Sequence, residues 1–255
     1  MRYFQETFAI AQRILTELVR RRRSLLFWGI FPSILLILNG LIIEERAAVT
    51  RSDAFGIAAA PTLVGAALFF SCLGGSVSTV VSEREQQTLK RLFLSPLSGF
   101  SYFSGIFIAH CVIGLGQGGL VVAIARLQGA VFEGSFWLSM LILMLSIAAY
   151  VGVGFVLGTQ LARRTEDVNA LVAAFGVPLL ILSGAFLPTS LFPDSLLRIA
   201  ELNPVYHMIE AMTAAMGGEE ADLHPHLGFL VSFAILMVGF GWLSYLRMIS
   251  VERRL

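Results

Sequence analysis

Six long apolar runs constrain this chain more than any other feature of its sequence. They are bounded by charged or turn-forming residues and cover Leu25–Ile43, Phe55–Val81, Phe100–Ala125, Phe136–Leu161, Val168–Leu187 and Leu227–Ile249. A helix needs about 20 apolar residues to cross the hydrocarbon core of a bilayer. The runs are continuous rather than alternating with period two, which favours helices over a β-barrel. The sequence therefore predicts an all-α integral membrane protein with six transmembrane helices.

The composition excludes the main alternatives. Hydrophobic residues make up 56% of the 255 residues and charged residues only 14%, whereas about 25% of an ordinary soluble domain is charged. A soluble fold of this size cannot hide so much apolar surface from water. This argues against a soluble enzyme and a disordered chain. The net charge of +1 gives no basic field that would attract nucleic acid.

Basic residues are distributed unevenly between the two ends of the predicted helices. The richer side carries Arg20–Arg23, Lys90, Arg91, Arg163, Arg164, Arg253 and Arg254, among others, and the poorer side carries Arg46, Arg51, Arg126 and Arg198. Lys and Arg accumulate in the cytoplasmic loops of membrane proteins. We therefore expect a multi-pass protein of the plasma (inner) membrane with both termini in the cytoplasm.

Residues 1–24 are predicted to form a separate N-terminal helix before the six-span domain at 25–255. Apolar residues recur there at helical spacing, namely Phe4, Phe8, Ala11, Leu15 and Leu18. Such a stripe is typical of an amphipathic helix that lies in the plane of the lipid headgroups. The alternative is a helix packed against a partner.

The connection after the second run is predicted to form a short charged helix at about 83–95. Ser82 and Glu85 have the spacing of a capping box, and Pro96 would end the helix. Leu89, Leu92 and Phe93 give it one apolar face. A helix of this kind suits a groove on a partner, although the pattern fits a helix resting on the headgroups equally well.

A second unusual segment, at about 188–218, follows the fifth run. A helix is expected from Asp194 to Asn203 and another from Val205 to Gly217. Both are apolar but too short to span a bilayer, so the pair is predicted to be a re-entrant hairpin at the outer mouth.

The residues that carry most enzymatic chemistry are missing or incomplete. The segment before Lys90, the one lysine, lacks the glycines of a phosphate-binding loop. His224 and His226 flank Pro225 in a predicted acidic loop, but two ligands do not close a metal site. Ser183 lacks the full pattern of an intramembrane serine protease. No metal site is expected.

Two features within the predicted spans leave a structural and a functional interpretation open. His110 is the one histidine there. Its structural role would be a hydrogen bond to a neighbouring helix, and its functional role would be in transport. The pairs Gly114 with Gly118 and Gly154 with Gly158 favour close helix packing, either within one subunit or between subunits.

Two segments resemble those of a known family. Ser82-Glu83-Arg84-Glu85 through Thr88-Leu89 and Leu94-Ser95-Pro96 is similar to the E-R-E-x-x-T-L…SP segment of ABC-2 type transporter permeases. Leu182 through Pro188, followed by Asn203-Pro204 and Glu210-Ala211, resembles their S-G-x-F-x-P…NP…E-A region. The order of the predicted elements matches as well. Gln87 departs from the pattern, because glycine is common at that position.

The resemblance implies a half-transporter without its own ATPase site. Two such chains, identical or different, would assemble with two ATPase subunits that bind ATP and Mg²⁺, and the chain itself would need no cofactor. The implied ATPase-coupling residues are Glu83, Arg84, Glu85, Thr88, Leu89, Arg91 and Leu92. The implied hairpin residues are Ser183, Gly184, Pro188, Asn203 and Pro204.

Members of this family export drugs, lipids, glycolipids or polysaccharides. The candidate residues along a substrate path are Phe31, Asn39, Phe69, Phe70 and His110. Few charges accompany them, which favours a hydrophobic or amphipathic substrate that leaves the cytoplasm or the inner leaflet. Aromatic rings also stack on sugars, so a polysaccharide exporter stays open. An autonomous channel or ion-coupled carrier is the remaining alternative.

Overall fold

The computed structural model describes residues 2–20, 22–86, 98–189, 192–218 and 220–252, and within these ranges it contains helices and connecting turns but no strand. Six helical segments are long and apolar enough to cross a membrane. They cover Arg22–Ala47, Arg51–Glu85, Gly99–Leu127, Phe136–Leu161, Thr165–Leu182 and Leu223–Ser250. The predicted six-span, all-α architecture is confirmed, with each predicted run inside or overlapping one of these helices.

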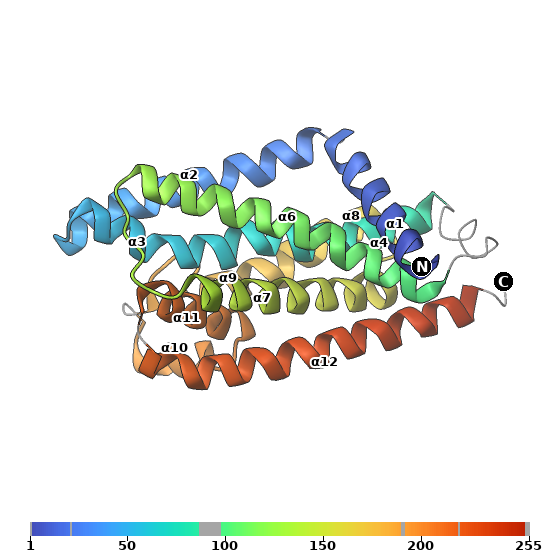
Figure 1. Ribbon diagram of the computed structural model, residues 1–255. Coiled ribbons are helices and arrows are strands. Elements are labelled where there is room, and N and C mark those ends of the chain that lie inside the picture. The colour runs from blue at the N-terminus through green and yellow to red at the C-terminus, as the bar shows by residue number, and fades with distance from the viewer. Residues whose placement is uncertain (1, 21, 87–97, 190–191, 219, 253–255) are drawn as a thin grey trace.

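The spans form one elongated bundle (Figure 1). Helices α2 (Arg22–Ala47), α6 (Gly99–Leu127) and α7 (Phe136–Val156) pack around a second span made of α3 (Arg51–Pro61), η1 (Thr62–Gly74) and α4 (Gly75–Glu85). Helix α12 (Glu220–Glu252) packs on α7. In the most apolar part of that second span, 78% of the residues are buried, against 22% in α2 and 17% in α12. The second span is therefore the core of the bundle.

The two ends of the bundle differ in what they carry (Figure 1). Helix α1 (Arg2–Arg20), the last turn of α4 and the last turns of α12 lie at one end, which we call the α4 end. The short helices α10 (Asp194–Ala200) and α11 (Pro204–Gly217) lie at the other, the α11 end. The start of α1 and the last turns of α4 and α12 thus share one end, whereas the junction of α1 and α2 lies partway along the bundle (Figure 1).

Three stretches of the spans are π-helical, and prolines border two of them. Segment η1 begins directly after Pro61, and η3 (Val172–Gly176) ends just before Pro178 in α9 (Val177–Leu182). Proline has no N–H to donate, so the regular hydrogen-bond ladder cannot pass through it unchanged. The third, η2 (Leu157–Leu161), continues α7 to its end. Such π-helical turns are rare and are frequently found at functional sites.

The glycine pairs pack helices together within this chain. A Cβ atom at Gly114 would lie 2.5 Å from the Cδ1 atom of Ile147, and one at Gly158 would lie 3.1 Å from the Cβ atom of Val80. Gly154 lies even closer to Ser76 of α4. These contacts bring α6, α7 and η2 against their neighbours, so packing within the subunit accounts for both pairs.

Three local predictions were wrong. Ser82 does not begin a new helix, because α4 runs through it to Glu85 and its hydroxyl donates to the carbonyl of Thr79. His224 and His226 lie in α12 rather than in a loop, and Pro225 lies inside the same helix. The fifth span ends at Leu182 instead of Leu187, since Gly184 adopts a left-handed conformation with φ of 86°.

Candidate functional site

Three consecutive residues, Glu83, Arg84 and Glu85, form the last turn of α4, and each contacts a different part of the bundle. They close the central span at the α4 end. We call them the α4 terminus. Their partners lie on α1, α6, η2 and α8 (Thr165–Leu171).

Glu83 is buried and holds two helices to α4. Its carboxylate accepts hydrogen bonds from the Arg13 guanidinium of α1 and from the Tyr102 hydroxyl of α6. Tyr102 in turn stacks on Tyr245 of α12, with the ring centroids 5.3 Å apart. A buried carboxylate is stable only when it is paired and hydrogen-bonded, so these partners are required for this position.

Arg84 closes the opposite side of the same turn. Its Nη1 atom donates to the carbonyl of Gly158, at 3.2 Å, and to that of Ala162, at 3.4 Å. These carbonyls belong to the end of the fourth span, where the backbone has no helical partners left. A cation there also interacts favourably with the helix dipole. Arg84 thus ties α4 to η2.

Glu85 binds the first residue of α8. One carboxylate oxygen accepts from the backbone N–H of Thr165 at 3.1 Å, and the other accepts from the Thr165 hydroxyl at 2.6 Å. Asp167 accepts from the backbone N–H groups of Arg163 and Arg164 at 2.8 and 2.9 Å. Carboxylates are favoured at a helix N-terminus for this reason. The fifth span therefore begins on the α4 terminus.

Helix α1 also holds the start of α6. The Glu6 carboxylate accepts from the backbone N–H of Ser98 at 3.2 Å and from the Ser101 hydroxyl at 2.9 Å. The segment between Glu85 and Ser98 is therefore flanked on both sides by residues with ionic or hydrogen-bonded anchors. The predicted coupling residues Thr88, Leu89, Arg91 and Leu92 lie in this segment, outside the described residues.

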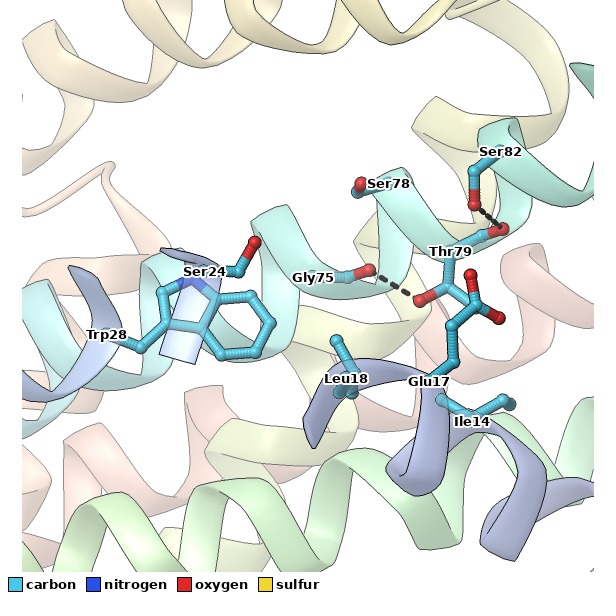
Figure 2. A pocket seen from close by; sticks show the side chains of 9 residues that line it. All are labelled: Ile14, Glu17, Leu18, Ser24, Trp28, Gly75, Ser78, Thr79 and Ser82. Atoms are coloured by element: carbon cyan, nitrogen blue, oxygen red, sulfur yellow. Dashed lines mark hydrogen bonds between the residues drawn. The ribbon is translucent and has the colours of Figure 1, made fainter. Parts of the chain in front are cut away.

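A small cavity lies between three elements next to the α4 terminus: α1, α4 and the first turns of α2 (Figure 2). Its volume is about 40 Å³, enough for a water molecule or two. Figure 2 shows Ile14, Glu17 and Leu18 of α1 facing Thr79 and Ser82 of α4. Hydroxyl and carboxylate oxygens line one part of the cavity and Trp28 lines another.

Three of the predicted substrate-path residues lie together. The rings of Phe31 and Phe70 are 5.3 Å apart and those of Phe69 and Phe70 are 5.2 Å apart, each pair edge to face. Phe27 and Tyr150 extend this aromatic cluster at its two ends. The cluster comprises Phe27, Phe31, Phe69, Phe70 and Tyr150, and it runs from the exposed surface of α2 into the core.

The other two predicted substrate-path residues do not join the aromatic cluster. Asn39 lies two turns further along α2, partly buried. His110 is fully buried in α6, with its Nδ1 atom 2.9 Å from the carbonyl of Ile106 one turn earlier. Its Nε2 atom and the Trp28 ring both lie beside Gly75. His110 therefore has a packing position in the core.

The predicted hairpin consists of α10 and α11, and its two motifs meet. Asn203 accepts from the backbone N–H of Val205 at 3.0 Å, which caps α11, and Pro204 occupies the first turn. The Asn203 Nδ2 atom also donates to the carbonyl of Leu179 at 2.7 Å. Buried Ser183 donates to the carbonyl of Leu180, while Pro188 is exposed after the Gly184 turn. The end of the fifth span is thereby fixed to the start of α11.

A histidine pair joins α11 to α12. The Nδ1 atoms of His207 and His226 are 2.9 Å apart, and His207 Nε2 lies 2.8 Å from the carbonyl of Glu201. Tyr206 packs on both imidazole rings; burial, with Glu210 and Glu201 nearby, raises the pKa of its phenol. Within the described ranges no three His, Cys, Asp or Glu side chains gather as metal ligands.

Sequence reasoning missed the partners of Glu83. Arg13 counts in the sequence only as one more basic residue, and Tyr102 follows no motif. The one available signal was the unusual acidic pair at the end of an apolar run. A charge in that place requires a partner, but the sequence alone does not name it.

The chain resembles known transporter proteins over most of its length. The model of the family described as ABC-2 type transporter matches residues 5–216. The inner membrane transport permease YhhJ of Escherichia coli K12 is 28% identical over 141 residues, covering 54% of this chain and 37% of that protein. The probable multidrug ABC transporter permease YbhR of the same organism is 30% identical over 136 residues, covering 52% and 36%. The matched part is little more than a third of each relative.

Proposed function

The chain belongs to the ABC-2 type transporter family, and on that premise we propose that it is the membrane-spanning permease subunit of an ATP-driven exporter. Two copies, or this chain and a related one, assemble with two ATPase subunits that bind ATP and Mg²⁺. The chain forms the substrate passage, and the movement of the ATPase subunits is transmitted to it. It lies in the inner membrane with both termini in the cytoplasm.

The observation that carries this proposal is the α4 terminus. The predicted ATPase-docking segment, about 83–95, begins on the residues that hold α1, α6, η2 and α8. A force applied to that segment reaches α1 and the third, fourth and fifth spans through hydrogen bonds of one helical turn. An ATPase pair drives transport only if it has different affinity for two arrangements of the permease. The α4 terminus supplies a rigid connection through which that preference acts.

The aromatic cluster supports the passage and its substrate class. Gly176 of η3 lies against Phe69, where a Cβ atom would be 2.6 Å from Phe69 Cζ, so the cluster lies between α2 and the fifth span. Those two spans also leave large apolar side chains exposed, including Phe27, Ile34 and Phe175. A second permease chain facing this surface would enclose an apolar, aromatic passage. Such a passage favours a hydrophobic or amphipathic drug, lipid or glycolipid.

The first experiment is purification of the chain from its native membrane in mild detergent, with identification of stoichiometric companions by mass spectrometry. We expect an ABC-type ATPase at a one-to-one ratio with the chain. Reproducible recovery of the intact chain without an ATPase would contradict the proposal and favour a channel or carrier that works alone.

The coupling role has its own test in the reconstituted complex. Thr165→Val removes the hydroxyl bonded to Glu85 and keeps the side-chain shape, whereas Thr165→Ser keeps the hydroxyl. We expect the ATPase to remain bound to both variants but substrate-stimulated ATP hydrolysis to fall several-fold only in Thr165→Val. Equal stimulation in both variants would remove the α4 terminus from the coupling route.

A further inference from the structure

We propose that a cavity between α6, α7 and α11 binds one acyl chain of an anionic phospholipid, whose phosphate pairs with Arg126. Helix α7 packs against both α6 and α11, and residues of all three line the cavity toward the α11 end of the bundle (Figure 1). This inference needs only that the chain lies in a membrane, and it stands whether or not the chain is an exporter.

The cavity has the size and lining of a site for a hydrocarbon chain. Its volume is about 290 Å³, close to the lower end of the range of about 300–1,000 Å³ for small-molecule sites. Apolar side chains from four elements line it: Leu63, Leu115, Val122, Met140, Leu143 and Met212. Methionine side chains adapt to flexible apolar ligands.

Glycine leaves part of the wall open. Gly119 lines the cavity, and a Cβ atom added there would have no heavy atom within 4 Å. The space beside Gly119 is therefore empty in the isolated chain and continuous with the cavity. Since apolar space in contact with lipid fills with hydrocarbon, a lipid chain is the natural occupant.

One cation marks the rim of this apolar cavity. Arg126, in the last turn of α6, lines the cavity, and its guanidinium lies 5.3 Å from the centroid of the Phe132 ring. Cation–π contact of this kind holds the guanidinium over the ring. Among the described residues Arg126 forms no ion pair. The Ser139 hydroxyl lines the same cavity.

The rim is preformed rather than loose. Arg51 donates to the Gln128 side-chain oxygen at 3.1 and 2.6 Å, which fixes the residues after Arg126. The backbone N–H of Gly134 donates to the carbonyl of Met216 at 3.0 Å, which ties the residues just before α7 to α11. Gly134 packs directly on Ala215, where a side chain would not fit.

Charge and position together select the occupant. An arginine at the end of a transmembrane helix lies at headgroup depth, and its fork of N–H donors matches a phosphate. An apolar cavity with one unpaired cation at its rim is complementary to a molecule with a hydrocarbon chain and an anionic head. A phospholipid of the adjoining leaflet has both and surrounds the site.

The test is native mass spectrometry of the purified full chain in mild detergent, titrated with dioleoyl phosphatidylglycerol or dioleoyl phosphatidylcholine. We expect the anionic lipid to bind about fivefold more tightly, the factor for one basic residue near an anionic headgroup. Arg126→Gln should reduce this ratio to about one without changing phosphatidylcholine binding. Glycerol phosphate, which lacks the chains, should not bind measurably.

Gly119→Leu tests the cavity and Gly116→Leu is its matched control. Both positions lie on α6 with open space around the Cβ atom, but only Gly119 lines the cavity. We expect Gly119→Leu to lower the binding of both lipids at least fivefold and Gly116→Leu to leave it unchanged. Undiminished lipid binding in Gly119→Leu, an unchanged ratio in Arg126→Gln, or full binding of glycerol phosphate would each overturn the proposal. Loss of dimers in Gly119→Leu with lipid binding intact would instead assign the cavity to a second copy.

Discussion

Arg13 and Glu83 are not equivalent members of their ion pair, because they differ in their access to water. The Arg13 side chain is 35% exposed and that of Glu83 only 6%. If Glu83 is lost, Arg13 can turn toward solvent. If Arg13 is lost, the Glu83 carboxylate stays buried with only the Tyr102 hydroxyl as a donor. The cost of breaking a buried pair falls mainly on the charge that remains inside.

We therefore expect Arg13→Ala to be more damaging than Glu83→Ala. Arg13→Ala should lower the free energy of unfolding by about 3 kcal/mol, and Glu83→Ala by about 1 kcal/mol. The temperature at which monodisperse protein is lost on heating, read by size-exclusion chromatography, ranks the two variants against the wild type. Arg13→Lys is the control and should lie near the wild type. Equal losses of stability in the two alanine variants would contradict the argument that Arg13, unlike Glu83, can turn toward solvent when its partner is removed.

Asn203 has two roles that different substitutions separate. It caps α11 as an acceptor and binds the end of the fifth span as a donor. Asn203→Asp keeps the cap but cannot donate to the Leu179 carbonyl, whereas Asn203→Ala loses both bonds. We expect a loss of about 1–2 kcal/mol for the alanine variant from the cap alone. Asn203→Asp should also be destabilised, because it places a carboxylate against a carbonyl.

The same heating assay distinguishes the two roles of Asn203. Asn203→Ser, which keeps a capping acceptor on a shorter side chain, is the control for the cap. Wild-type stability in Asn203→Asp would show that the bond to Leu179 contributes nothing and that the hairpin is held by its cap alone.

At the scale of elements, α1 is a docked helix rather than an isolated one. Ile10, Ala11 and Ile14 are buried, and Ile10 lies against Gly105 of α6. Phe4 and Phe8, two residues of the predicted membrane-facing stripe, are exposed. The helix therefore packs on the bundle of its own chain with one face and leaves another face exposed. Whether lipid or a partner covers the exposed face stays a prediction.

We expect Gly105→Val to displace α1 from α6. A Cβ atom at Gly105 would lie 2.7 Å from Ile10 Cγ2 and 3.1 Å from the backbone carbonyl of Thr7, and the carbonyl cannot move without moving α1. Overpacking of this kind costs about 1–3 kcal/mol. Gly116→Val on the same helix has open space and is the matched control. Faster proteolysis near residue 20 in Gly105→Val alone is the expected readout; identical digestion of the two variants would show that α1 is not held by this contact.

At the scale of the whole molecule, the sequence predicts the spans well and the connections between them poorly. Hydropathy finds six helices because the bilayer demands a long apolar run wherever the chain crosses it. The partners of Glu83 depend on how α1 and α6 cross α4, which no local pattern encodes. The π-helical segments and the early end of the fifth span at Gly184 are likewise set by packing and by single residues.

The last prediction concerns the orientation of the bundle. Arg163 is exposed at the α4 end and Glu201 is exposed near the α11 end, so a cysteine at each position reports one side of the membrane. Because basic residues favour the cytoplasm, a membrane-impermeant maleimide should label Glu201→Cys in intact cells and Arg163→Cys only after the cells are opened. The unmodified chain is the blank, since Cys72 is buried and Cys111 is partly buried within the spans. Labelling of Arg163→Cys in intact cells would place the α4 terminus outside the cell, where no ATPase that uses cytoplasmic ATP could reach it.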